Sequence, residues 1–251
     1  MSIVSAPRVR SSSSPLSEEP HNDDNNNNNN YFTAIARKDA ELIRTLRKQG
    51  SNVNAKSTFP QDFHRTPLHL CVYDNYIEGA KILIDGGADV NALDDLQDSP
   101  FLLTCAEGRE EILKLMLQTS ESVKKFGSAT SRRLKTAVPD TTLHNRQGDS
   151  ALHLGAERGH LPIVKLLLTQ KEKLKESIDV NAYNNARLTP LLSVLELGGD
   201  DRLHVEIVKL LIQHGADVQL PDAEGHTPLS LAKEYKFSRM VQLLEDAGAT
   251  E

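Results

Sequence analysis

Residues 150–154 read Ser-Ala-Leu-His-Leu, and residues 163–167 read Ile-Val-Lys-Leu-Leu. The first segment predicts the start of a helix, because the hydroxyl of Ser150 can accept a hydrogen bond from an otherwise unpaired amide of the first turn. The second segment is an apolar run that predicts another helix. A pair of helices this short cannot bury its apolar side alone, so the segment predicts neighbours of the same kind.

Five versions of the first segment occur along the chain. They begin at Thr66, Ser99, Ser150, Thr189 and Thr227, at intervals of 33, 51, 39 and 38 residues. Proline follows the capping residue in all versions except that of Ser150. Proline suits the first helical position, because its missing N–H has no helical partner there. An apolar run follows each version, at residues 82–84, 112–116, 163–167, 207–211 and 240–244.

Glycine turns close several of these units. Examples are Gly87-Ala88-Asp89-Val90-Asn91 and Gly215-Ala216-Asp217-Val218. Glycine after a helix supplies the left-handed conformation that ends it. The chain is therefore expected to be a stack of helix pairs separated by turns.

The Thr-Pro-Leu-His segment, the run from Gly159 to Leu167 and the Gly-Ala-Asp-Val-Asn turn resemble the ankyrin-repeat family over residues 31–250. The resemblance implies an all-α solenoid of stacked helix-turn-helix units joined by β-turn fingers. We count six units, from a degenerate first unit at residues 31–61 to a last unit that begins at Asp222. The stretch 97–113 and the insertion 198–201 are similar to small stand-alone ankyrin proteins of bacteria and fungi.

The flanking sequence and the composition narrow the function. Residues 1–30 end in a polar low-complexity tract and are expected to be a disordered tail; Pro7 and Pro15 argue against a helical targeting peptide. The net charge of −6 and the absence of tryptophan argue against a nucleic-acid partner. No apolar run is long enough to span a membrane. Cys71 and Cys105 are interpreted as reduced core residues. We expect a monomer in the cytoplasm, with the nucleus as a second location.

Two departures from the repeat attract attention. The 51-residue interval predicts an insertion near residues 119–140 with five basic and two acidic residues. We interpret it as a solvated loop, with two alternatives: a docking loop controlled by phosphorylation at Ser128, Thr130 or Ser131, and a nuclear localisation signal. The loop 56–65 is also long. Its Phe59 and Phe63 either pack against the neighbouring turn or serve as anchors for a partner.

Motifs for catalysis are absent, since the sequence contains no phosphate-binding loop, dinucleotide fingerprint, zinc motif or nucleophile elbow. We therefore predict no enzyme, no cofactor and no metal. The family resemblance implies that His69 and His153 hydrogen-bond the framework. Asp94, Asp95, Asp98 and Glu107 lack the pattern of a calcium loop and are interpreted as a solvated acidic turn.

The ankyrin family binds partners with its turn tips and with the exposed face of each first helix. Carried onto this sequence, that resemblance gives the candidate partner-binding residues Phe63, His64, Tyr73, Asp74, Tyr76, Asp95, Gln97, Glu107, Arg146, Glu157, Arg158, Tyr183 and Arg187, together with Gln147, Asn184 and Glu196. Tyr73 and Tyr76 lead the set, because tyrosine is enriched at binding hot spots. The alternative is that one of them packs under the loop 56–65.

The sequence thus predicts a protein-binding module with a regulatory or scaffolding role. The alternative is a client of a modifying enzyme, through phosphorylation or through hydroxylation of Asn91, which resembles asparagines hydroxylated in some ankyrin proteins. Leu166 is predicted to lie in the core between units, and Lys125 in the insertion.

Overall fold

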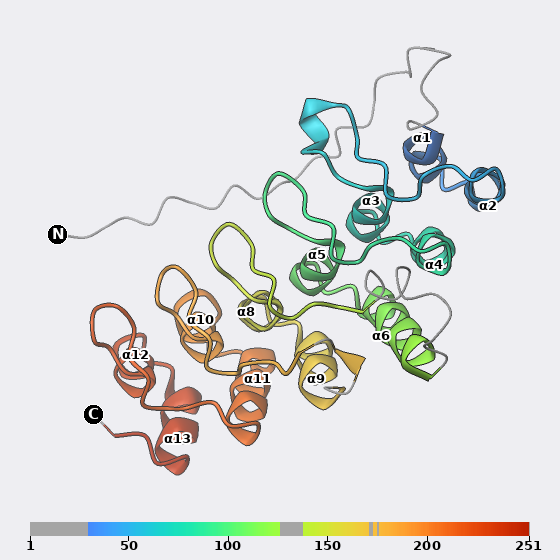
Figure 1. The fold of residues 1–251 in the computed structure, drawn as a ribbon. Coiled ribbons are helices and arrows are strands. Elements are labelled where there is room, and N and C mark those ends of the chain that lie inside the picture. The colour runs from blue at the N-terminus through green and yellow to red at the C-terminus, as the bar shows by residue number, and fades with distance from the viewer. Residues whose placement is uncertain (1–29, 126–137, 171–172, 175, 251) are drawn as a thin grey trace.

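The computed structural model describes residues 30–125, 138–170, 173–174 and 176–250, and these residues form helices and turns without a strand (Figure 1). The helices are α1 Asn30–Ala36, α2 Ala40–Lys48, α3 Pro67–Tyr73, α4 Ile77–Asp85, α5 Pro100–Ala106, α6 Glu110–Lys125, α8 Ala151–Glu157, α9 Leu161–Thr169, α10 Pro190–Leu197, α11 Arg202–Gln213, α12 Pro228–Glu234 and α13 Ser238–Asp246, with a 3-10 turn η1 at Pro60–Asp62. The expected all-α solenoid is confirmed.

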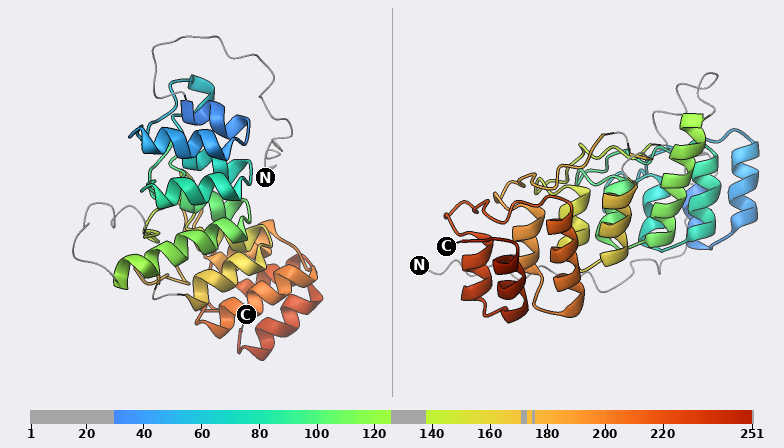
Figure 2. Two further views of the ribbon diagram at one scale, coloured as in Figure 1. Left: turned by 90° about the vertical axis from the view of Figure 1, so that its right-hand side faces the viewer. Right: turned by 90° about the horizontal axis from the view of Figure 1, so that it is seen from below.

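The helix pairs stack into two layers. The first helices α1, α3, α5, α8, α10 and α12 lie on the side of the projecting turns, and the second helices lie on the opposite side. Figure 2 shows the helices standing side by side along the length of the stack. The turns between units, which we call fingers, all project from one edge. No helix among the described residues is long and apolar enough to cross a membrane.

Two buried histidines join neighbouring units. The Nδ1 atom of His69 accepts a hydrogen bond from the amide of Thr66 at 3.1 Å, and its Nε2 atom donates to the carbonyl of Asp98 in the next unit at 3.1 Å. In His153, Nδ1 accepts from the amide of Ser150 at 3.3 Å, and Nε2 donates to the carbonyl of Leu188 in the next unit at 2.9 Å. This pattern requires the neutral ring. Burial accordingly lowers the pKa of His69 to about 4 and lowers that of His153.

Three asparagines clamp neighbouring turns in the same way. The carboxamide oxygens of Asn54, Asn91 and Asn181 accept from amides of the next turn at 2.7, 2.9 and 2.8 Å. Their amide nitrogens donate to carbonyls of that turn at 3.3, 2.9 and 3.1 Å. Both ends of Asn91 are therefore bonded, and an enzyme that modified this side chain would first have to open the turn.

A continuous apolar core runs through the stack from Tyr31 to Ala249. Tyr31 and Phe101 are among its largest fully buried side chains. Cys71 and Cys105 are buried free thiols, as expected, and burial raises the pKa of both. The core is shared between units and belongs to no single one, which is why the units stack.

The insertion differs from its expected form at its first residues. Helix α6 continues to Lys125, so residues 119–125 are helical and not part of a loop. Ser120 is fully buried and donates a hydrogen bond to the carbonyl of Lys173, a contact that extends the helix against the next unit. Residues 126–137, with the proposed phosphorylation sites and the basic residues Arg132, Arg133 and Lys135, lie outside the described residues, as does the tail 1–29.

The prediction that Leu166 is buried is wrong, because the buried side chain is that of the next residue, Leu167. Ile163, Val164, Leu167 and Leu168 of α9 are buried, whereas Leu166 is only partly buried at the edge of the core. The helical period explains the difference, because positions three and four apart share a face.

We predict that Leu167→Ala lowers the free energy of unfolding by about 2–5 kcal/mol, because Leu167 is fully enclosed. Leu166→Ala removes the same atoms from a partly open site and should cost clearly less. Urea unfolding followed by circular dichroism measures both. Equal losses in the two variants would show that α9 faces the core differently.

Candidate protein-interaction surface

Four of the five fingers share one turn built around an Asp or Asn side chain. One Oδ1 atom in each of these four accepts hydrogen bonds from the amides two and four residues later, at 2.8–3.0 Å. The residues that supply this oxygen are Asp94, Asn145, Asn184 and Asp222. Asp and Asn are interchangeable here, because both offer the accepting oxygen.

The fourth residue of each of these four turns has the left-handed backbone conformation, with a positive φ. Glycine occupies this position in two fingers, as Gly148 with φ 79° and Gly225 with φ 89°. Gln97 and Arg187 occupy it in the others, with φ 61° and φ 58°. A residue with a Cβ atom pays about 1–2 kcal/mol for this conformation. The fingers with Gln97 and Arg187 thus present an exposed side chain, and their left-handed backbone costs free energy that the fingers with Gly148 and Gly225 do not lose.

Hydrogen bonds between fingers fix their spacing. The amide of Asp95 donates to the carbonyl of Phe63 at 2.9 Å, and the guanidinium of Arg146 donates to the carbonyl of Asp95 at 2.7 Å. The amide of Asn185 donates to the carbonyl of Gln147 at 3.0 Å. The finger tips therefore form one connected row instead of independent loops.

The loop 56–65 folds over the row at its N-terminal end. Arg65 lies 5.4 Å from the ring of Phe63 and 5.6 Å from the ring of Tyr73, and its Nε donates to Asp94 at 3.1 Å. His64 pairs with Asp95 at 2.7 Å. Tyr73 is thus half-covered by this loop, whereas Phe63 is 40% exposed.

Two candidate residues are corrected because they are buried. Tyr76 is 9% exposed; its hydroxyl donates to the carbonyl of Lys38 at 2.9 Å, and its ring lies over Gly79. Glu157 is 4% exposed at the end of α8, and its carboxylate lies 3.7 Å from the guanidinium of Arg158. Neither side chain is accessible to a partner.

The acidic residues near the second finger do not converge on one point. Asp94 binds Arg65 and its own turn, Asp95 pairs with His64, and Glu107 pairs with Arg158 at 3.4 Å and Arg109 at 3.5 Å. Burial, together with the charge of Asp94, raises the pKa of Asp98 to about 6. These carboxylates are spread over separate partners, so this group offers no shared cation site.

Arg109 and Arg158 also hold the ends of the first helices. Arg109 donates to the carbonyls of Val72 at 3.1 Å and Tyr73 at 3.0 Å, and Arg158 donates to the carbonyl of Ala106 at 2.9 Å. Each arginine therefore caps the first helix of the preceding unit. Asp74 lies next to these groups and is half-buried, and its burial raises its pKa.

The fourth finger presents a stacked pair. The guanidinium of Arg187 lies 5.0 Å from the ring of Tyr183, and the Tyr183 hydroxyl donates to the carbonyl of Pro221 at 3.0 Å. Tyr183 is half-buried and Arg187 is exposed. The arginine is therefore the accessible member of the pair.

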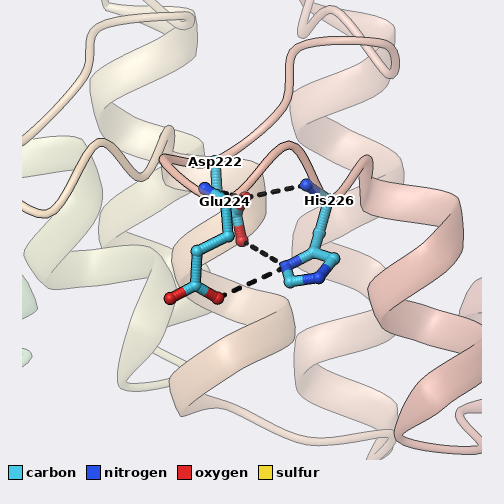
Figure 3. A group of neighbouring side chains, drawn as sticks. All are labelled: Asp222, Glu224 and His226. Carbon is cyan, nitrogen blue, oxygen red and sulfur yellow. Dashed lines mark hydrogen bonds and ion pairs between the residues drawn. The ribbon is translucent and has the colours of Figure 1, made fainter.

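The fifth finger contains a group that sequence reasoning missed. The Nδ1 atom of His226 lies 3.1 Å from Asp222 and 3.6 Å from Glu224 (Figure 3). Among the described residues this is the only set of three such side chains whose ligand atoms all lie within 4.8 Å of one another. Its spacing, Asp-x-Glu-x-His, is visible in the sequence. The three groups could hold a metal ion, but the hydrogen bond that His226 donates to the Asp222 carboxylate raises the pKa of His226, and the bound proton opposes a cation.

The comparisons with known proteins identify the class of repeat. The family profile described as ankyrin repeats (3 copies) matches residues 15–94, 123–220 and 170–250. The chain therefore belongs to the ankyrin-repeat family. Ankyrin repeats generally mediate protein–protein interactions, and their fold is that of a non-enzymatic interaction scaffold.

Particular relatives are small proteins of the same build. The chain is similar to the ankyrin repeat protein YahD of Escherichia coli (strain K12), with 32% identity over 87% of this chain and 96% of that protein. A solved ankyrin repeat domain from Acinetobacter baumannii AYE is 32% identical, covers 88% of this chain and 99% of its own, and has a TM-score of 0.74. The ankyrin repeat protein EF0377 is 33% identical over 86% of this chain and 96% of its own, with a TM-score of 0.72.

We predict that Gln97→Gly stabilises the protein by about 0.5–1 kcal/mol, because glycine relieves the left-handed cost and partly offsets it with its own backbone entropy. Gly225→Gln makes the reverse change at the matching position, where a Cβ atom meets open space. It should destabilise by a similar amount. Thermal unfolding measures both; a loss of stability in Gln97→Gly contradicts the assignment of strain.

We predict that Asp222→Asn lowers the pKa of His226 towards its ordinary value of about 6.5. Asparagine keeps the turn, as Asn145 and Asn184 do, but removes the negative charge. In the wild type the raised folded pKa makes this contact stabilising below about pH 6.5, and the contribution is lost as the pH rises through the folded value. A titration of the imidazole by NMR checks this; an unchanged pKa would show that Glu224 holds the proton instead.

Proposed function

We propose that this protein is a binding module that holds another protein along its fingers and first helices, in a regulatory or scaffolding role. The observation that carries the proposal is that framework positions of the repeat are constant, whereas exposed positions vary. Framework positions repeat from unit to unit: the Thr or Ser cap, the Asp or Asn of the finger and the clamping Asn. The positions that face outwards do not repeat.

The position eight residues after each capping residue shows this variation. In successive units it holds Asp74, Glu107, Arg158, Leu197 and Tyr235, and each of these side chains is partly or fully exposed. Core packing does not impose this variety, because these side chains lie outside the core. Exposed residues that differ from unit to unit on a constant framework are expected when the surface is adapted to one particular protein partner.

The rigidity of the row supports binding. Hydrogen bonds hold the fingers to one another and fix the turn within each finger, so binding of a partner loses little conformational entropy in ordering them. A stable interface buries about 800 Å² on each side, which requires contacts to several units. The row from Phe63 to the fifth finger supplies such a continuous surface.

The accompanying properties follow from the same surface and composition. We propose a protein partner and not a nucleic acid, because the net charge is −6. We propose a monomer without catalytic activity. The free thiols Cys71 and Cys105 support a reducing compartment, and we propose the cytoplasm, with the nucleus as a second location.

Affinity capture from the native cell with quantitative mass spectrometry tests the proposal. The variant Phe63→Ala/Glu107→Ala/Arg187→Ala changes two fingers and a first helix, and it should lower recovery of the principal partner about tenfold, since anchor residues dominate interfaces. The control Lys81→Ala/Lys165→Ala/Lys209→Ala changes exposed residues of the second helices and should recover the partner in full.

Circular dichroism must show both variants folded. A partner that survives the first variant and is lost with the second would place binding on the opposite side of the stack and contradict the proposal.

A further inference from the structure

Two large apolar side chains are exposed at equivalent positions of adjacent units, at the C-terminal end of the row. Leu197 is 46% exposed at the end of α10, and Tyr235 is 42% exposed just after α12. Both stand eight residues after the capping threonine of their unit, so stacking of α10 on α12 makes them neighbours. The same position holds a charged residue in the three preceding units, as Asp74, Glu107 and Arg158.

Carboxylates surround this apolar pair. Glu196 and Glu234 precede the two residues in their helices, and Asp222 and Glu224 belong to the adjacent finger. Burial, followed by the charges of Asp222 and Glu224, raises the pKa of Glu196. The groups are therefore close enough to repel one another.

The charges of this end are not balanced, unlike those of the middle of the row. Glu107 has two arginines within 3.5 Å. In the part of the chain that the structure describes, neither Glu196 nor Glu234 forms an ion pair. Lys233 lies 3.6 Å from Glu245 of α13, and the finger carboxylates Asp222 and Glu224 pair with His226.

We infer that Glu196, Leu197, Glu224, Glu234 and Tyr235 form a docking surface for a linear protein segment in which Lys or Arg residues flank a large apolar side chain. This inference rests on the proposed function and names the chemistry of the partner. Cations of the segment relieve the repulsion among the carboxylates, and charge complementarity of this kind sets specificity and association rate. The apolar residue of the segment covers Leu197 and Tyr235, which supply the contact area.

Other occupants fit this surface less well. A second copy of the chain carries the same net charge of −6 and would bring carboxylates together. A phosphorylated or acidic segment meets the same repulsion. A divalent cation would engage only the finger group and would leave Leu197 and Tyr235 uncovered.

The test uses the full-length protein and a fluorescein-labelled synthetic peptide of about 12 residues, long enough for an extended segment to cross two units. The peptide carries Lys and Arg on both sides of a Leu. Fluorescence anisotropy gives the dissociation constant. The variants Glu196→Lys/Glu234→Lys and Leu197→Ala/Tyr235→Ala should each weaken binding about tenfold.

A matched control separates a specific site from bulk charge. Asp85→Lys/Glu206→Lys makes the same change in net charge on exposed residues of second helices, and it should alter the dissociation constant less than about twofold. A second peptide with Ser in place of Leu should bind about tenfold more weakly. If the charge-reversal variant misfolds by circular dichroism, Glu196→Gln/Glu234→Gln replaces it, with the same expected direction.

Several results would overturn the inference. They are absence of binding to the wild type, equal weakening in the Asp85→Lys/Glu206→Lys control, and equal affinity for the Ser peptide. Self-association of the wild type that Glu196→Lys/Glu234→Lys abolishes would assign the surface to a second copy. Full competition by a synthetic peptide of residues 1–20 would assign it to the protein's own N-terminal segment.

The two proposals can fail separately. If Phe63→Ala/Glu107→Ala/Arg187→Ala loses the native partner while Leu197→Ala/Tyr235→Ala keeps it, the docking inference fails and the binding function stands. If neither variant changes recovery, both fail.

Discussion

Burial of apolar side chains between successive helix pairs is the interaction on which the rest of this structure depends. Leu68, Phe101, Leu152, Leu191 and Leu229 stand at the same place in five units, and each is at most 2% exposed. None of these side chains would be buried by its own unit alone, so the core of each unit is completed by its neighbours. The buried histidines and the clamping asparagines then fix the register, because each leaves a donor or acceptor unsatisfied if the units slide.

That register is what makes a surface out of separate turns. Because each finger is bonded to the one before it, a residue at a finger tip is held at a set distance from its equivalents along the row. The frame is firm enough to hold Gln97 and Arg187 in a conformation that glycine adopts more easily. Backbone strain of this size persists only where the surroundings determine the conformation.

Much of this was predictable from the sequence, because capping residues, apolar runs and glycine turns are local signals. Exposure was less predictable, because it depends on the next unit. Glu157, Glu196 and Glu234 occupy the same repeat position, yet Glu157 is buried and the other two are exposed. Tyr76 is buried because Gly79 leaves room for its ring. The extension of α6 to Lys125 is accompanied by a hydrogen bond from Ser120 to the carbonyl of Lys173, and the sequence near Ser120 gives no indication of this distant contact.

The charges divide the surface into two parts with different consequences for binding. In the middle, Glu107, Arg109 and Arg158 already satisfy one another and the helix ends, so a partner that displaced them would have to replace those bonds. At the C-terminal end the carboxylates repel one another, and a cation that approaches Glu196 and Glu234 gains attraction without breaking an existing pair. Shape therefore governs contact with the middle of the row, and charge governs contact with its end. A partner that used both would need its basic residues at one end only, which fixes the direction in which it lies along the solenoid.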